Sequence, residues 1–109
     1  MEINKEILKG YIDIILVSRL RKKAMYGYEL SKEILKISND SFEIKEGSLY
    51  LSLKRLEKSG YLKSFWANET SGGGRRKYYE ITDLGIDFLN NKKEEWLFFK
   101  EVIDKFLEV

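Results

Sequence analysis

The sequence predicts a mainly α-helical fold with one small β-wing, and three features predict it. Apolar residues recur at helical spacing in four segments, at about residues 4–22, 28–38, 46–59 and 84–107. Two short aromatic runs, at about 61–67 and 75–81, have the alternation of strands. Glycines 72–74 lie between these runs and predict a turn. The order helix, helix, helix, wing, helix is typical of a winged helix-turn-helix followed by one C-terminal helix.

The first predicted helix, residues 4–22, is too apolar to bury only one stripe. Its apolar side chains cover most of the helix: Ile7, Leu8, Tyr11, Ile12, Ile14, Ile15, Leu16, Val17 and Leu20. A helix with this pattern is buried on more than one side. In a chain of 109 residues, we expect the second burial partner to be another copy of the chain. The alternative is a central helix buried within one monomer.

The second predicted helix, residues 28–38, carries one apolar face. That face is formed by Leu30, Ile34 and Ile37. Beyond it, Phe42 and Ile44 alternate with charged residues. This alternation predicts a short strand that supports the wing.

The third predicted helix, residues 46–59, combines an apolar side with a cationic one, and Gly60 ends it as a C′ glycine. Its apolar side is formed by Leu49, Leu53 and Leu56. A major groove about 12 Å wide admits one such helix. The residues predicted to contact DNA are Gly47, Ser48, Tyr50, Leu51, Lys54 and Arg55. Taken alone, the pattern of this helix favours the interpretation as an amphipathic surface helix with ordinary solvated charges.

The wing indicates DNA binding more strongly than the helix does. Its glycines let the turn fit a groove, and clustered cations displace counterions from phosphates. The predicted wing contacts are Gly73, Arg75, Arg76 and Lys77. The alternative is a solvated hairpin whose charges prevent edge-to-edge aggregation. DNA contact is favoured because the basic wing directly follows a basic helix.

Charge is unevenly distributed, although the net charge is only +2. Residues 46–82 carry seven Lys or Arg against four Asp or Glu. Residues 83–109 carry four against seven. A basic centre followed by an acidic tail predicts that one face meets phosphates while the tail has another role.

The last predicted helix, residues 84–107, begins after a cap at Thr82 or Asp83. A heptad-like spacing of large apolar residues predicts a dimer interface. The residues predicted to form it are Trp96, Phe99, Ile103 and Phe106, together with Ile7 and Tyr11 of the first helix. Paired Trp96 rings across a two-fold axis also suit a flat aromatic ligand. From the residues alone, the dimer core is the favoured interpretation of Trp96.

The composition excludes several function classes. The chain has neither cysteine nor histidine, which excludes disulfides, ordinary zinc or thiol chemistry and a histidine general base. We recognise no catalytic motif among the remaining carboxylates, lysines and hydroxyls, so we expect a non-enzyme without cofactor or metal. No apolar stretch of about 18 residues and no signal peptide are visible. The expected location is a reducing cytoplasm.

Three motifs resemble those of the PadR family of transcriptional regulators, in its short subfamily with a single C-terminal helix. They are YGYEL at 26–30, EGSLYLSLKRLEKSGYL at 46–62 and GGGRRKYYEITDLG at 72–85. Glu46 and Leu51 stand where the family often has prolines. The resemblance implies a homodimeric regulator that binds double-stranded DNA, usually as a repressor. Two-fold symmetry predicts a pseudo-palindromic operator.

Two segments, residues 65–79 and 94–96, are similar to a multidrug-binding repressor of this family. The similarity implies a pore between two subunits, where Trp96 of each subunit stacks on planar aromatic ligands. Lys100 lies one turn beyond Trp96 and disfavours cationic ligands, although Glu6 could supply an acid at the pore. The alternatives are a neutral ligand, an anionic ligand or no ligand. The predicted ligand-binding residues are Trp96, Phe99, Lys100 and Glu6.

The predicted organisation has two parts. Residues 1–82 form a winged helix-turn-helix DNA-binding domain that includes the N-terminal helix, and residues 83–109 form a C-terminal dimerisation helix. The alternative function is a winged-helix module that binds protein through its aromatic residues, without specific DNA binding. Salt dependence separates the two, because phosphate binding weakens steeply with salt.

Overall fold

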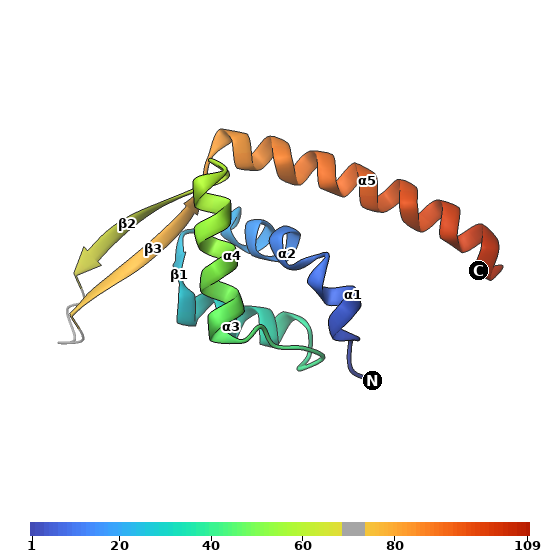
Figure 1. The fold of residues 1–109 in the computed structure, drawn as a ribbon, viewed down its shortest axis with the longest axis horizontal. Coiled ribbons are helices and arrows are strands. Elements are labelled where there is room, and N and C mark those ends of the chain that lie inside the picture. The colour runs from blue at the N-terminus through green and yellow to red at the C-terminus, as the bar shows by residue number, and fades with distance from the viewer. Residues whose placement is uncertain (69–73) are drawn as a thin grey trace.

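The computed structural model describes residues 1–68 and 74–109 (Figure 1). The elements are α1 (Lys5–Lys9), α2 (Ile12–Leu20), β1 (Met25–Tyr26), α3 (Gly27–Ile37), α4 (Glu46–Lys58), β2 (Leu62–Asn68), β3 (Arg75–Ile81) and α5 (Asp83–Leu107). The predicted fold class is confirmed: the chain is mainly helical with one small antiparallel sheet. The molecule measures 55 × 32 × 21 Å, and the wing and the end of α5 point to opposite ends of its longest axis (Figure 1).

The single helix predicted for residues 4–22 is wrong, because the chain breaks between α1 and α2. The backbone N–H of Gly10 donates to Ile7 O at 3.3 Å, and the N–H of Tyr11 donates to Leu8 O at 2.8 Å. Glycine costs about 1 kcal/mol inside a helix relative to alanine, so it favours such an end. The two pieces also differ in burial. α2 is the central helix of the monomer, whereas Ile7 of α1 is 61% exposed.

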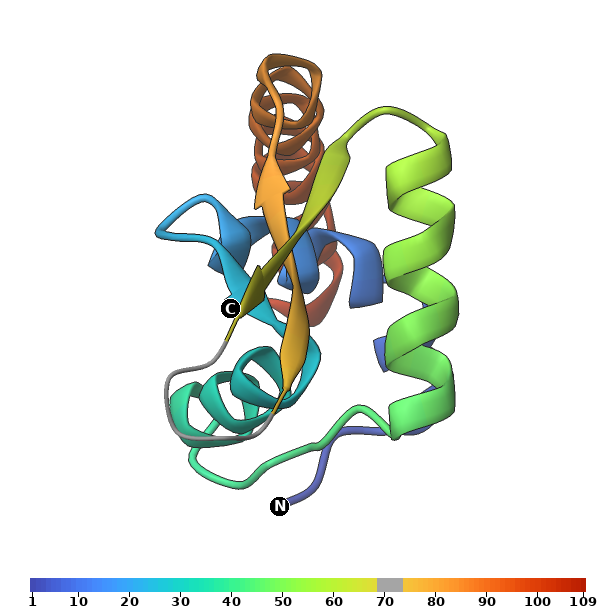
Figure 2. The ribbon, with the colours of Figure 1, turned by 90° about the vertical axis from the view of Figure 1, so that its left-hand side faces the viewer.

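One core lies between α2, α3, α4 and the sheet. Its fully buried side chains are Leu16, Val17, Leu20, Met25, Leu30, Leu49, Leu53, Leu56 and Leu62. Burying a side chain of this size contributes about 1.5–3 kcal/mol. Figure 2 shows α4 standing beside the hairpin, with α2 passing behind it. The predicted apolar side of α4 is therefore confirmed.

The sheet has the order β1–β3–β2, and both pairings are antiparallel. The strand predicted at Phe42 and Ile44 is wrong, and β1 takes the third place, with Met25 opposite Tyr79. Ile44 lies in the loop that precedes α4 and is buried in the core, and Phe42 is half-buried against the same core. The alternation of these two residues therefore reflects burial against the helices rather than strand pairing.

A compact corner joins α4, the wing and α5. Gly60 has φ +86°, a left-handed conformation that suits the C′ position of α4. The hydroxyl of Thr82 donates to Gly60 O at 2.6 Å and accepts from Gly85 N–H at 3.0 Å. A side chain at Gly85 would overlap the carbonyl of Tyr61, whose ring stacks on Phe88. This corner fixes the direction in which α5 leaves the rest of the molecule.

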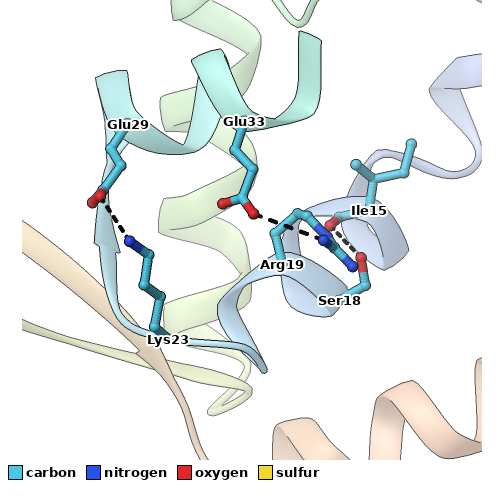
Figure 3. Close-up of polar contacts among 6 residues, drawn as sticks. All are labelled: Ile15, Ser18, Arg19, Lys23, Glu29 and Glu33. Atoms are coloured by element: carbon cyan, nitrogen blue, oxygen red, sulfur yellow. Dashed lines mark hydrogen bonds and ion pairs between the residues drawn. The ribbon is translucent and has the colours of Figure 1, made fainter. Parts of the chain in front are cut away.

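Ion pairs accompany the apolar contact between α2 and α3 (Figure 3). Arg19 lies 3.8 Å from Glu33, and Lys23, just after α2, lies 3.3 Å from Glu29. Surface pairs of this kind contribute about 0–1 kcal/mol each. The buried leucines therefore dominate the packing of the two helices.

Candidate nucleic-acid interface

The outer face of α4 is open to solvent along its length. Gly47, Ser48 and Lys54 are exposed, and Leu51 is 69% exposed. A Cβ atom at Gly47 would meet no heavy atom within 4 Å, so the first turn of the backbone can approach another molecule closely. The predicted outward orientation of these residues is confirmed. Their contact with DNA remains a prediction.

Tyr50 differs from its neighbours on α4 because its ring covers the start of α3. A Cβ atom at Gly27 would overlap the phenol of Tyr50, so a larger residue there would displace this ring. Tyr50 nevertheless stays 44% exposed. It therefore joins the two helices of the helix-turn-helix and also forms part of its outer face.

Arg55 is directed toward α2 rather than fully outward. Its Nη2 atom pairs with the carboxylate of Asp13 and lies 3.5 Å from Ser52 Oγ. More than half of the Arg55 side chain remains exposed. A phosphate must therefore compete with Asp13 for this guanidinium. Neither the helical spacing nor the charge count of α4 could reveal this competition.

The inner face of the wing continues the surface of α4. Successive strand residues point to opposite faces, so Arg75 and Lys77 share this face with Trp66, which lies opposite Lys77. The guanidinium of Arg75 lies 5.3 Å from the centre of the Trp66 ring, and Lys77 Nζ lies 6.0 Å from it. Cations over aromatic faces are electrostatically stabilised. The wing therefore presents its charges on an aromatic support.

The outer face of the wing holds Arg76. Its guanidinium lies 4.4 Å above the ring of Tyr26. Tyr26 packs edge-to-face on Tyr78, which stacks on Phe65. The aromatic row anchors Arg76 near the middle of the hairpin. The remaining predicted wing contact, Gly73, lies outside the described residues.

Glu57, in the last turn of α4, links this helix to both strands of the wing. Its Oε2 atom accepts a 2.5 Å hydrogen bond from Ser64 Oγ of β2. Its Oε1 atom lies 3.9 Å from Lys77 Nζ of β3. Burial, and then the nearby charge of Glu57, raise the pKa of the Tyr79 phenol behind this cluster. Sequence reasoning missed this junction, and its only signal was the position of Glu57 at the end of a basic helix.

The far part of α5 exposes a large apolar surface. Within α5 only Gly85 and Leu89 are buried. The exposed large apolar residues further along are Trp96, Leu97, Phe98, Phe99, Phe106 and Leu107. Monomeric proteins rarely expose such a contiguous patch. In residues 1–68 and 74–109, no helix is long and apolar enough to span a membrane.

The predicted ligand residues are only partly brought together. Trp96 packs edge-to-face on Tyr11 with ring centres 5.5 Å apart, and it lies 6.5 Å from Phe99. Lys100 Nζ pairs with Asp104 at 2.8 Å. Glu6 lines a different hollow, between α1 and the loop before α4. One chain therefore places Tyr11, rather than Glu6, beside the tryptophan.

The chain is similar to known proteins in both sequence and structure. The profile of the family described as "Transcriptional regulator PadR-like family" matches residues 16–91. A transcriptional regulator from Clostridium thermocellum is 44% identical, with a TM-score of 0.85 over 93% of this chain and 97% of that one. A PadR family transcription regulator from hypervirulent Clostridium difficile is 52% identical, with a TM-score of 0.78 over 89% and 98%. A Lysinibacillus sphaericus protein called uncharacterized protein X is 42% identical over 97% of this chain and 96% of its own length.

Proposed function

The chain belongs to the PadR-like family of transcriptional regulators, which are non-enzymatic DNA-binding proteins, and from this premise we propose that it is a homodimeric repressor of a specific operator. The resemblance drawn from the three sequence motifs is thereby confirmed. One observation carries the proposal. Helix α4 and the inner face of the wing, which carries Lys77, meet at the carboxylate of Glu57.

In this proposal α4 enters a major groove. Gly47, Ser48 and Leu51 meet base edges, and Lys54 meets the phosphates one turn later. The wing lies toward the flanking minor groove, where its cations displace counterions. The aromatic rings beneath Arg75 and Arg76 support this role, because cation–π contacts hold both guanidinium groups in place on the wing.

We assign dimerisation to residues 83–109, with residues 1–82 as the DNA-binding part. The seam of α5, in which Phe99 and Phe106 are exposed and Ile103 is half-buried, packs against the partner together with Ile7 and Tyr11. Its exposure supports this assignment, because burying each such side chain contributes about 1.5–3 kcal/mol. A two-fold axis then presents two α4 helices to half-sites about one helical turn apart.

A planar aromatic ligand between the two Trp96 rings would act as the inducer. The pairing of Lys100 with Asp104 supports neutral and cationic ligands alike, because the ammonium charge is compensated. Such a ligand acts by favouring one arrangement of the two DNA-binding heads over another. Trp96→Ala should abolish binding of a planar fluorescent dye. Dissociation of the dimer with unchanged dye binding would instead assign Trp96 to the interface alone.

The test is a titration of purified protein on DNA from upstream of its own gene and on a shuffled version, at two salt concentrations. We expect preference for the upstream DNA and binding that weakens steeply with salt. Equal binding to both DNAs contradicts a specific operator in that region. No binding to either DNA at low salt contradicts DNA binding altogether and favours a module that binds protein through α5.

A further inference from the structure

We propose that Glu57 is a positioning residue that sets DNA specificity, by bracing the wing against α4 and by holding Lys77 away from indiscriminate phosphate binding. The inference rests on the proposed DNA-binding function. It adds a negatively charged residue to an interface otherwise described by its cations.

The first step is the brace. Ser64 and Lys77 lie on the same face of the hairpin, on β2 and β3 respectively. Glu57 uses one oxygen for each of them, at 2.5 Å and 3.9 Å. Hydrogen bonds to an ionised acceptor are stronger than neutral ones. A single carboxylate therefore fixes both strands of the wing relative to the helix proposed to enter the major groove.

The second step is the restraint on Lys77. Its ammonium lies between the Glu57 carboxylate and two ring faces, 5.6 Å from the centre of Tyr79 and 6.0 Å from that of Trp66. Its side chain is 39% exposed, and that of Glu57 is 34% exposed. By contrast, Arg75 is exposed nearer the wing tip. The charge of Lys77 is thus compensated by the protein, whereas that of Arg75 rests on a neutral ring.

The third step is the consequence for specificity. A carboxylate beside the interface repels phosphates of every sequence, so it weakens non-specific binding. On the matching operator, the brace lowers the cost of ordering the wing. Specificity is a difference between two affinities, and repulsive groups commonly enlarge it. Glu57 therefore lowers binding to unrelated DNA more than binding to the operator.

The decisive variant is Glu57→Gln, titrated on operator and shuffled DNA over a range of salt. Affinity for shuffled DNA should rise. The slope of log affinity against log salt should steepen by about 0.9 as Lys77 gains one phosphate contact. The preference for the operator should fall by about threefold to tenfold, the effect of one hydrogen bond. In Glu57→Gln combined with Lys77→Met, the slope should return to its original value while the preference stays low.

Two further variants separate the brace from a general effect of charge. Glu80→Gln makes the same charge change on β3, where Glu80 pairs with Lys63 at 3.4 Å. It should leave the preference unchanged, and an equal loss in this variant overturns the inference. Ser64→Ala removes the hydrogen bond but keeps the charge. It should lower the preference without changing the salt slope, and it carries the test alone if Glu57→Gln does not fold.

A measurement without DNA tests the brace directly. The chain has no cysteine, so spin labels can be attached to cysteines placed at the exposed positions Lys54 and Asn68. Electron-electron resonance on labelled protein diluted with unlabelled protein reports the distance within one subunit. The distribution should broaden in Glu57→Gln and Ser64→Ala but not in Glu80→Gln. An unchanged distribution overturns the brace.

DNA binding to an operator and the brace at Glu57 can be contradicted separately. If the unmodified protein shows no preference for any upstream DNA, the proposed function fails, and the spin-label distances still decide whether the brace exists. If the protein prefers its operator but Glu57→Gln keeps both the preference and the salt slope, the further inference alone is overturned.

Discussion

The winged helix-turn-helix and the far half of α5 follow opposite patterns of burial. In the former, Leu16, Leu30 and Leu53 are completely buried. Beyond Leu89, most of the large apolar side chains of α5 are exposed, and Phe106 is 79% exposed. The first region completes its own core within one chain. The second has the composition of a core but an exposed surface, which is the reason for proposing that a second copy of the chain covers it.

The largest expected effect comes from a substitution in the exposed half of α5. Phe99→Glu places a charge on the face proposed to meet the partner, and an unpaired buried charge costs about 3–5 kcal/mol. The dimer dissociation constant should rise by at least about a hundredfold, measured by light scattering with size-exclusion chromatography. The helical spectrum of the DNA-binding part should persist, because its core does not include this residue.

Asn91→Glu is the matched control for that variant. Asn91 is exposed on α5 outside the apolar seam, so the same charge there should leave the dimer intact. A Phe99→Glu protein with an unchanged dissociation constant would contradict the proposed interface.

The contrast also explains which elements could be predicted from the sequence. α4, β3 and the start of α5 were predicted closely, because their signals are local. Gly60 ends α4, and Thr82 caps α5 through its own hydroxyl. The two-residue strand β1 could not be predicted, because Met25 and Tyr26 become a strand only by pairing with β3. Propensity carries no information about such a tertiary contact.

The site was predictable to a similar degree. Helical spacing correctly assigned Ser48, Leu51 and Lys54 to the outer face of α4. Spacing could not show that Arg55 turns to Asp13, or that Lys77 meets Glu57. Both partners are carboxylates on other elements, and only the packing of α2 and the wing against α4 brings them within reach.

The next effect concerns the corner that joins the two regions. Gly85→Ala drives a methyl group into the carbonyl of Tyr61, and overpacking of this kind costs about 1–3 kcal/mol. Urea unfolding should show that loss in the free energy of unfolding. Gly47→Ala should show no comparable loss, because a methyl group there meets no neighbour within 4 Å. Equal stability of both variants would mean that the corner adjusts easily.

A smaller effect tests the wing as a source of sequence-independent affinity. Arg76→Ala should weaken binding to all DNA sequences alike and flatten the salt slope by about 0.9, the value for one lost phosphate contact. The preference for the operator should not change. Anisotropy titrations at several salt concentrations measure both quantities. Unchanged affinity at every salt concentration would remove Arg76 from the interface.

The smallest expected effect concerns a single ion pair within the winged helix-turn-helix. Asp13→Asn releases Arg55 from α2, and an exposed pair contributes only about 0–1 kcal/mol to folding. Stability should therefore change little, while DNA affinity rises and the salt slope steepens, since the guanidinium becomes available to a phosphate. Glu29→Gln breaks a comparable exposed pair with Lys23, on α3 rather than against α4, and should leave DNA binding as it was. If Asp13→Asn also leaves the DNA affinity and the salt slope unchanged, Arg55 stabilises the fold and does not contact DNA. Lys54 is then the last residue of α4 in the proposed DNA interface.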